Sequence, residues 1–287
     1  FMMVFASIES VLKNLFGTSF RISQGLPVHG GDINQVYKLL TSEGTFLIKI
    51  NQNDLPKLFE KEAKGLELLR KNTDFRIPTI LAVNASADGH FMLMEYISSG
   101  RKTTDYWQEF GEQLAHMHRE THDHFGLDYN NYIGSLSQSN ELHEKWSSFY
   151  FHERILKQLV LLEEKLSFSS QQLNALNERI EQLFSNQAPS LLHGDLWSGN
   201  CMVDEQHKPV LIDPAVYYGH REMDLAMAQL FGGFDESFYT TYNQVFPLEQ
   251  NWRSRVEMCQ LYPLLVHANL FGGHYINSCK NIILKNV

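Results

Sequence analysis

The chain has 287 residues, of which 43% are hydrophobic, and it carries a formal net charge of −9. It is long enough to bury a substantial core, either as one large domain or as two lobes. Its basic residues are scattered and form no stripe along which a phosphate backbone could bind, which argues against a nucleic-acid partner. The three irregularly spaced cysteines fit neither a disulfide framework nor a zinc ribbon, so a reducing cytoplasm is the expected location.

Residues 1–97 have the pattern of a small antiparallel sheet with helices packed on it. Apolar residues at helical spacing predict a helix over 4–16. Charged residues such as Glu9 and Lys13 interrupt this apolar start, so we expect neither a signal peptide nor a membrane-spanning helix. Alternating segments predict strands around 20–23, 36–39 and 45–50.

Gly30 and Gly31 lie between two of these expected strands. A glycine-rich loop at this place would let backbone N–H groups approach the phosphates of a nucleotide closely. Taken alone, however, a plain hairpin turn is the commoner explanation of such a pair. The glycines therefore gain meaning only from the residues that follow them.

Lys49 lies in an apolar strand, where a buried ammonium group needs an anionic partner. The next predicted helix, over 56–71, carries Glu62 beside its apolar face. A strand lysine paired with a helix glutamate is the kinase arrangement that holds the lysine against the α- and β-phosphates of ATP. The alternative is that Lys49 and Glu62 both face solvent.

An apolar strand over 91–97 runs into a polar break at 98–100, which is typical of a boundary between lobes. We therefore divide the chain into an N-terminal nucleotide-binding lobe, residues 1–97, and a C-terminal lobe, residues 98–287, that holds catalysis and the acceptor. Helices are predicted in this second lobe over 106–119, in two amphipathic segments within 141–186, and over 224–230, 234–246 and 252–270.

The histidines between 116 and 124 include the i, i+4 pair His118 and His122. A zinc site needs at least a third ligand, so we interpret these histidines as solvated or capping residues. The aromatic residues that follow in the second lobe are interpreted as core, not as part of a cofactor site. They are Phe231, Phe234, Phe238 and Tyr239.

Asp195 and Asn200 lie five positions apart, in a glycine-containing segment between two short apolar runs. A kinase catalytic loop has the same interval: its Asp accepts the proton of the substrate hydroxyl, and its Asn holds Mg²⁺. Asp213 closes the second apolar run and is the expected second metal ligand. Each residue alone could be a turn or cap residue, but the three together with the glycines predict phosphoryl transfer from ATP with Mg²⁺.

Two longer motifs carry a resemblance to known proteins. They are HGDLWSGN over 193–200 and IDPAVYYGHREMDLAM over 212–227. Their HGD and DPA triplets resemble the aminoglycoside phosphotransferase and choline kinase branch of the protein-kinase-like superfamily. The motifs as a whole closely resemble the fructosamine kinase (ketosamine kinase) family, with further similarity from Gly30 to Tyr275. The resemblance implies an α+β, bilobal protein-kinase-like fold, with an antiparallel sheet plus helix in the N-lobe and a mainly helical C-lobe.

The same resemblance implies an activity. Such an enzyme uses ATP to phosphorylate O3 of a sugar joined to an amine, as in a ribulosamine, a fructosamine or a glycated lysine, and so serves protein deglycation or repair. In this superfamily the segment corresponding to Glu95, Tyr96 and Ile97 is the hinge that binds adenine through its backbone. Family members with redox-controlled dimers carry a cysteine in the glycine-rich region, whereas the first cysteine here is Cys201. A redox switch of that kind is therefore not expected. The expected oligomeric state is a monomer or weak dimer.

On the acceptor side, the resemblance points to Trp197, Asn131 and Arg221. Trp197 could offer an apolar face to a sugar ring or to a cationic amine, but it could equally be a packing anchor. Asp224 is interpreted as a residue that orders the catalytic loop. No Ala-Pro-Glu segment follows Asp213, which disfavours a protein kinase.

Two alternative functions remain open at this point. One is a kinase for a different small alcohol, such as an aminoglycoside or a choline-like compound. The other is a catalytically silent nucleotide-binding protein. A catalytically silent protein would be expected to lack one or more of the four residues needed for phosphoryl transfer. All four are present, which disfavours this alternative: Lys49, Asp195, Asn200 and Asp213.

Overall fold

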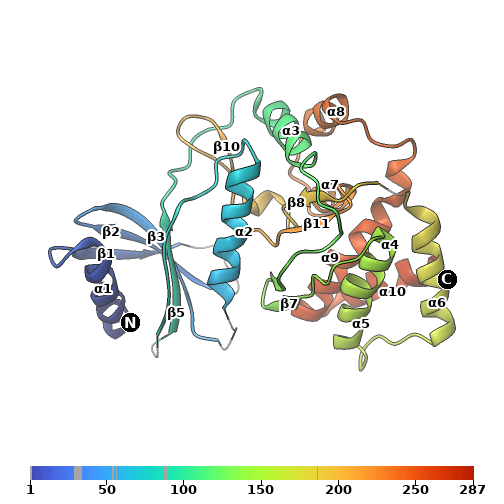
Figure 1. The fold of residues 1–287 in the computed structure, drawn as a ribbon, viewed down its shortest axis with the longest axis horizontal. Helices are drawn as coiled ribbons and strands as arrows, with labels where there is room; N and C mark the ends of the chain where they lie inside the picture. Colours follow the sequence, from blue (N-terminus) through green and yellow to red (C-terminus); the bar gives the residue numbers. More distant parts are fainter. Residues whose placement is uncertain (1, 29–33, 54, 56, 87–88, 186) are drawn as a thin grey trace.

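The protein folds into two lobes joined side by side, one built on a sheet and the other mainly helical (Figure 1). The computed structural model describes residues 2–28, 34–53, 55, 57–86, 89–185 and 187–287. Gly30 and Gly31, predicted to cover the nucleotide phosphates, lie outside the described residues. In the part of the chain that is described, no helix is both long enough and apolar enough to cross a bilayer.

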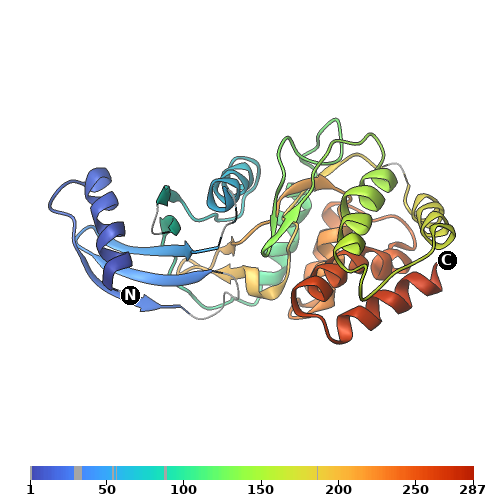
Figure 2. The same ribbon diagram turned by 90° about the horizontal axis from the view of Figure 1, so that it is seen from below.

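The N-lobe is a five-stranded antiparallel sheet with the strand order β1-β2-β3-β5-β4. Helix α1 packs on one face of the sheet and helix α2 on the other (Figure 2). Each of the two predicted helices thus buries its apolar side against the sheet. Strand β5 shows why both fit: its alternate residues Phe91 and Leu93 join the α1 core, whereas Met92 and Met94 join the α2 core. The elements are α1 (Met2–Phe16), β1 (Ile22–Pro27), β2 (Gln35–Thr41), β3 (Gly44–Asn51), α2 (Leu58–Asn72), β4 (Ile80–Ser86) and β5 (Gly89–Glu95).

The C-lobe combines helices with short two-stranded ladders that carry the loops of the site. The strands are β6 (Asn131–Ile133), β7 (Leu136–Gln138), β8 (Ser190–Leu192), β9 (Cys201–Val203), β10 (Pro209–Leu211) and β11 (Tyr217–Gly219). The α-helices are α3 (Tyr106–Met117), α4 (Trp146–Phe149), α5 (Lys157–Leu161), α6 (Ser170–Leu183), α7 (Glu222–Leu230), α8 (Glu236–Val245), α9 (Val256–Phe271) and α10 (His274–Lys285).

Most of the helices expected in the second lobe are confirmed, with two differences. The first amphipathic segment is not one α-helix, because a π-helical stretch over Tyr150–Leu156 separates α4 from α5. Helix α10 was not among the predicted elements. The core interpretation is confirmed for Phe238, which is fully buried and packs against Phe110 and Trp107 of α3, but it is wrong for Phe231, which is 38% exposed.

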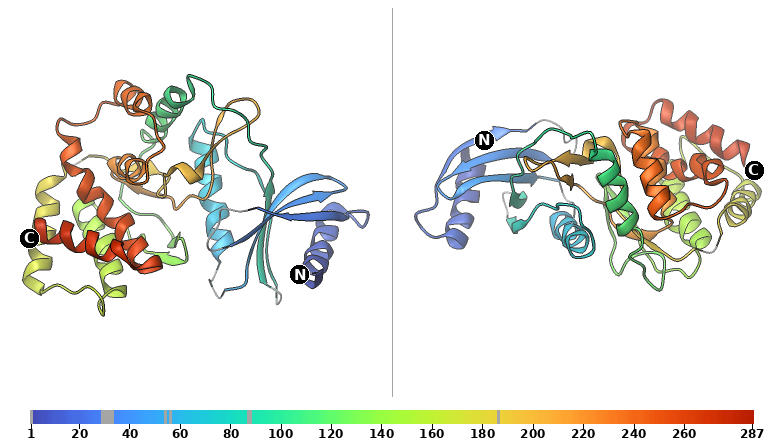
Figure 3. Two further views of the ribbon diagram at one scale, coloured as in Figure 1. Left: turned by 180° about the vertical axis from the view of Figure 1, so that it is seen from behind. Right: turned by 90° about the horizontal axis from the view of Figure 1, so that it is seen from above.

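Helix α2 stands between the lobes and contacts β4 and β5 on one side and β6 on the other (Figure 3). It approaches the C-lobe so closely that a Cβ atom at Gly65 would lie 3.1 Å from Val216 Cγ2. A second junction is made by Arg76, whose backbone exchanges hydrogen bonds with Pro209 and Leu211 of β10. The sheet lobe is therefore fixed directly on the segments that flank the predicted metal ligand Asp213.

Lowering the pH should destabilise the fold, because His220 is buried as a neutral ring. Burial, assisted by the charges of Arg255 and Arg221, lowers the pKa of His220 to about 3, whereas an unburied histidine has a pKa near 6.5. Between these values the unfolded chain binds more protons, so each pH unit of acidification costs about 1.4 kcal/mol for this one group. In His220→Phe, the free energy of unfolding in urea should fall less between pH 7 and pH 5 than in the wild type.

Phenylalanine at this position preserves the ring that packs against Phe184 and Trp146. The exposed His152 provides a control, because His152→Gln also removes one histidine but not a buried one. Identical pH dependence in the wild type and His220→Phe would contradict the prediction.

Candidate active site

One buried carboxylate, that of Asp224, holds the start of the loop over 193–200 in place. Asp224, at the start of α7, accepts hydrogen bonds from the backbone N–H groups of His193 (2.8 Å) and Gly194 (3.0 Å). Gly194 has φ +81°, and a Cβ atom there would lie 2.0 Å from the Ala215 carbonyl oxygen, so only glycine fits. Asp224 therefore orders the loop and does not face the cavity between the lobes, as its sequence context indicated.

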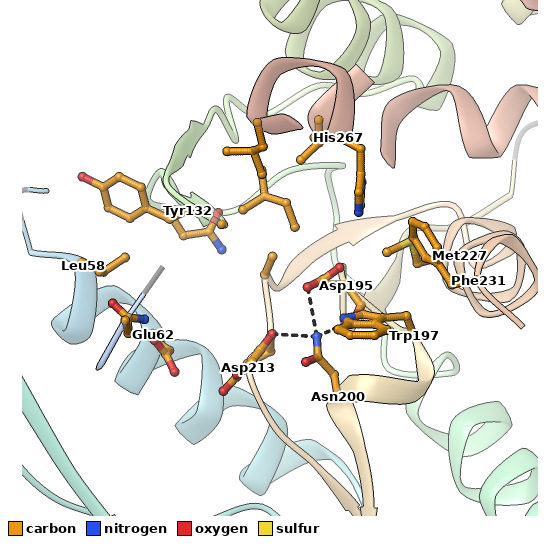
Figure 4. A pocket seen from close by; sticks show the side chains of 18 of the residues that line it. Leu58, Glu62, Tyr132, Asp195, Trp197, Asn200, Asp213, Met227, Phe231 and His267 are labelled. Carbon is orange, nitrogen blue, oxygen red and sulfur yellow. Dashed lines mark hydrogen bonds between the residues drawn. The ribbon is translucent and has the colours of Figure 1, made fainter. Parts of the chain in front are cut away.

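Asp195 and Asn200 meet at the top of this loop (Figure 4). The Asn200 side-chain nitrogen donates to the backbone oxygen and to Oδ2 of Asp195, both at 2.9 Å. Burial raises the pKa of Asp195 to about 7, although the hydrogen bond from Asn200 opposes the shift. A carboxylate with this pKa can accept a proton near neutral pH, which is the property that a general base needs.

Lys49, Glu62 and Asp213 form a buried ionic cluster at the junction of the lobes. Lys49 is 5% exposed and lies 2.6 Å from the Glu62 carboxylate, while its ammonium group also contacts Asp213. Burial alone would lower the pKa of Lys49, but Asp213 and Glu62 outweigh it and raise this pKa. The alternative in which Lys49 and Glu62 face solvent is therefore wrong, and the predicted pair is present.

Asp213 adopts a left-handed backbone conformation with φ +54°. A non-glycine residue in this region carries conformational strain, which persists only where the surroundings enforce it. The side chain is 45% exposed and lines the cavity between the lobes, so the strained turn presents a carboxylate to that cavity.

The residues present fit a Mg²⁺ ion. The Asn200 amide directs its nitrogen at Asp195, which leaves its oxygen available, and Asp213 already attracts a cation in the form of the Lys49 ammonium group. One carboxylate and one amide oxygen, completed by water and phosphate oxygens, match the preference of Mg²⁺ for hard ligands. Within the described residues, no cluster of three or more His, Cys, Asp or Glu side chains could hold another metal.

His118 and His122, the pair that we did not interpret as a metal site, have different surroundings. His118 is 1% exposed, and its ring nitrogens contact Asp224 (3.2 Å) and the Tyr242 hydroxyl (2.8 Å). It is therefore a buried support of the loop carboxylate. His118 is also the C-cap residue of α3, so the capping interpretation is confirmed for its position, whereas the solvated one is wrong. His122 bonds to the backbone of His124 and stacks on Tyr218.

The proposed hinge residues have distinct surroundings. The Glu95 backbone N–H donates to the Thr79 carbonyl (2.8 Å), so this amide is already engaged within the sheet. The Glu95 side chain pairs with Arg76, and the Tyr96 ring lies 4.2 Å from the Lys38 ammonium group. Glu95, Tyr96 and Ile97 do not line the cavity described next. An adenine contact at Tyr96 or Ile97 stays a prediction.

A cavity of about 460 Å³ opens between the lobes and contains Lys49, Asp195 and Asp213 in its lining. Trp197 also lines it, with its ring lying over Gly199, where a Cβ atom would come within 2.1 Å of the indole. The ring is therefore both a packing anchor for the loop and a wall of the cavity, which combines the two interpretations that the sequence left open.

The C-lobe supplies further cavity walls that were not among the predicted site residues. They are Tyr132, Met227, Phe231, His267, Leu270, Phe271 and Tyr275. The Nδ1 atom of His267 lies 2.7 Å from the Pro263 carbonyl oxygen, which makes it the protonated nitrogen and leaves Nε2 as an acceptor. Burial lowers the pKa of His267, so the ring is kept neutral. Helix α9 carries apolar residues around its whole circumference and has no single polar face, so its pattern did not mark this polar position.

Two of the residues assigned to the acceptor have structural partners. Asn131 lines the cavity, but its nitrogen donates to the Val216 carbonyl (2.8 Å) and its oxygen accepts from Gln138 and Asn140 (2.8 Å each). Its amide thus supports the segment after Asp213. Arg221 lies away from the cavity, so its geometry does not support a substrate contact; it donates to the carbonyls of Phe246 and Pro247 at the end of α8.

A sheet lobe and a helical lobe, with a lysine, a glutamate and two aspartates converging between them, define a bilobal phosphotransferase of the protein-kinase-like class. The model of the fructosamine kinase family matches residues 4–287, and the chain belongs to this family. It is therefore an ATP-dependent kinase.

Individual relatives agree with this assignment. A protein of Enterococcus faecium named a probable ketoamine kinase is 39% identical over 255 residues, covering 87% of this chain and 90% of that protein. The chloroplastic protein-ribulosamine 3-kinase of Arabidopsis thaliana is 37% identical over 93% of this chain and 83% of its own length. A solved Haemophilus somnus structure assigned to the fructosamine-3-kinases superposes with a TM-score of 0.89 at 28% identity, covering 99% and 97% of the two chains.

A more distant structure extends the likeness in fold alone. It is a thermostable mutant of the aminoglycoside phosphotransferase APH(4)-Ia, in a ternary complex with AMP-PNP and hygromycin B. Its TM-score is 0.65 at 16% identity, over 97% of this chain and 98% of that one.

Proposed function

We propose that this enzyme transfers the γ-phosphoryl group of ATP to the O3 hydroxyl of ketosamines, such as ribulosamines and fructosamines, including glycated lysines. The observation that carries the proposal is the shape of the cavity: a phosphoryl-transfer cluster on one side and aromatic walls on the other. The relatives named for ketoamine and ribulosamine phosphorylation support the acceptor class. A role in protein deglycation or repair, in the cytoplasm and as a monomer or weak dimer, completes the proposal.

In this mechanism, Asp195 accepts the proton of the acceptor hydroxyl and orients its oxygen toward the γ-phosphorus. Lys49, held by Glu62, binds the α- and β-phosphates, and Asn200 and Asp213 hold Mg²⁺. When bound, Mg²⁺ supplies neutralisation of charge on the phosphate oxygens. Phosphoryl transfer depends mainly on positioning and charge neutralisation. The hydrogen bonds of Asp224 and Asn131 to the backbone of the site therefore contribute to the rate of transfer, because they hold the reacting residues in position. Residues 1–97 provide the nucleotide side and residues 98–287 the acceptor side.

The test is ATP consumption with ribulose-lysine, fructose-lysine and erythrulose-lysine, measured beside choline and an aminoglycoside. We expect at least one ketosamine to be phosphorylated with a kcat/KM of about 10⁴ M⁻¹ s⁻¹ or more, within the usual range of enzymes. Mass spectrometry of the product identifies the phosphorylated oxygen. Turnover of choline or the aminoglycoside, with none of the ketosamines consumed, would replace the proposal with the rival small-alcohol kinase.

A further inference from the structure

Three aromatic side chains form the outer rim of the cavity; we call Phe231, Phe271 and Tyr275 the aromatic lip. Phe231 is 38% exposed and Phe271 is 55% exposed, whereas the inner walls Met227 and Val266 are 5% and 3% exposed. Single exposed hydrophobic side chains are common, but a contiguous group of them beside a cavity is typical of a binding surface. The walls of the cavity are thus buried in its interior and exposed to solvent at its aromatic rim.

The aromatic lip is connected to the reactive loop through a continuous series of rings. The centroid of Phe231 lies 6.3 Å from that of Trp197 and 4.8 Å from that of His267. The His267 ring in turn lies 5.6 Å from Phe271 and 5.1 Å from Tyr275. Figure 4 shows Phe231 on the Trp197 side of Asp195, so the lip lies on this side of the reactive loop.

The turn between α9 and α10 places two lip residues on the same rim. Phe271 ends α9, and Tyr275 lies in the first turn of α10. The two residues between the helices, Gly272 and Gly273, have φ +65° and +63°. This conformation strains any residue with a side chain, although a Cβ atom at either glycine would meet nothing within 4 Å. Glycine is therefore favoured at these two positions because of the backbone conformation and not because a side chain would lack space.

No carboxylate faces the aromatic lip among the described residues that line the cavity. The acidic residues of this lining are Glu62, Asp195 and Asp213, all in the phosphoryl-transfer cluster. A cationic amine near the lip would consequently meet ring faces, and an alkyl chain would meet apolar carbon. These two properties describe the amine end of a substrate better than its hydroxylated sugar end.

In a ketosamine the amine lies close to the reacting hydroxyl. The reacting hydroxyl is on C3 and the amine nitrogen is on C1, so a sugar with O3 at Asp195 carries its amine only two carbons away. We propose that the aromatic lip binds the substituent of this amine, and that the enzyme selects ketosamines whose amine carries a long aliphatic or aromatic group, such as the stem of lysine. This proposal rests on the proposed function and specifies its acceptor.

The experiment varies the amine and keeps the sugar constant. The acceptors are ribulose adducts of methylamine, Nα-acetyl-lysine and phenethylamine, and the variants are Phe271→Ser and Phe231→Ser. In the wild type, kcat/KM should be higher for the two long adducts than for the methylamine adduct. In each variant the ratio of kcat/KM for a long adduct to that for the methylamine adduct should fall about tenfold, mainly through KM, because the lost contact is apolar.

Leu284→Ser serves as the matched control, because Leu284 is 44% exposed on α10 and does not line the cavity. Its ratio should equal that of the wild type. A second series compares ribulose and fructose adducts of methylamine. If Phe271→Ser changes the preference between these sugars and not that between amines, the lip binds the sugar tail and the proposal is overturned.

The two proposals fail in different ways. Equal losses by the lip variants on all amine adducts, with ketosamine turnover intact in the wild type, would remove the lip proposal alone. Absence of wild-type turnover on every ketosamine would remove the proposed function and the lip proposal with it.

Discussion

Replacing Asp195 with asparagine should lower kcat by about 10² to 10⁴-fold, the usual contribution of a positioned general base. The variant keeps the shape of the side chain but cannot accept the hydroxyl proton. Asn200 would keep its 2.9 Å bond to the backbone oxygen of residue 195, so the loop should hold its conformation. The melting temperature should therefore stay close to that of the wild type while turnover is lost.

Three measurements separate chemistry from binding in this variant. They are kcat at saturating acceptor, the dissociation constant for ATP measured by calorimetry without acceptor, and the thermal unfolding midpoint. Asp128→Asn, an exposed carboxylate away from the cavity, controls for the removal of one negative charge. A variant at Asp195 that retains more than a tenth of wild-type kcat would refute the role as base.

The parts of the site that could be predicted are those encoded by local spacing. Asp195, Asn200 and Asp213 share one short segment, and the two ladders β9-β10 and β8-β11 bring its ends together. Lys49 and Glu62 could be predicted because burying a lysine in a strand requires a nearby anion. In each case a chemical requirement could be stated from the sequence before any fold was known.

The aromatic cavity walls could not be predicted in the same way. His267, Phe271 and Tyr275 come from the last two helices, and only tertiary packing brings them beside a loop some seventy positions earlier in the chain. Asn131 and Arg221, which were predicted on the acceptor side, donate to backbone carbonyls in this structure, and a substrate contact at either stays a prediction. A polar residue inside a recognised motif therefore indicates a position that the site needs. Only the contacts of its side chain show whether that residue binds substrate or holds the backbone of the site in place.

The loop carboxylate Asp224 itself depends on a buried ion pair two positions earlier in α7. Arg255 donates two hydrogen bonds to Glu222, from Nε to Oε2 at 2.8 Å and from a terminal nitrogen to Oε1 at 2.6 Å. Glu222 is 1% exposed and Arg255 is 7% exposed. Burial raises the pKa of Glu222, and the bonds from Arg255 oppose that rise. The pair therefore fixes the N-terminal turn of the helix that holds the catalytic loop.

Replacing Arg255 with methionine should lower the free energy of unfolding by about 3 to 5 kcal/mol, because it leaves the Glu222 carboxylate buried without its partner. The double variant Arg255→Met, Glu222→Leu should recover a large part of this loss, since removing both charges leaves no uncompensated group in the core. Urea unfolding at pH 7 measures both quantities. A single variant within 1 kcal/mol of the wild type would contradict the prediction. A double variant that is stable but slow would show that the ion pair positions Asp224 for catalysis, since stability and loop geometry would then be separated.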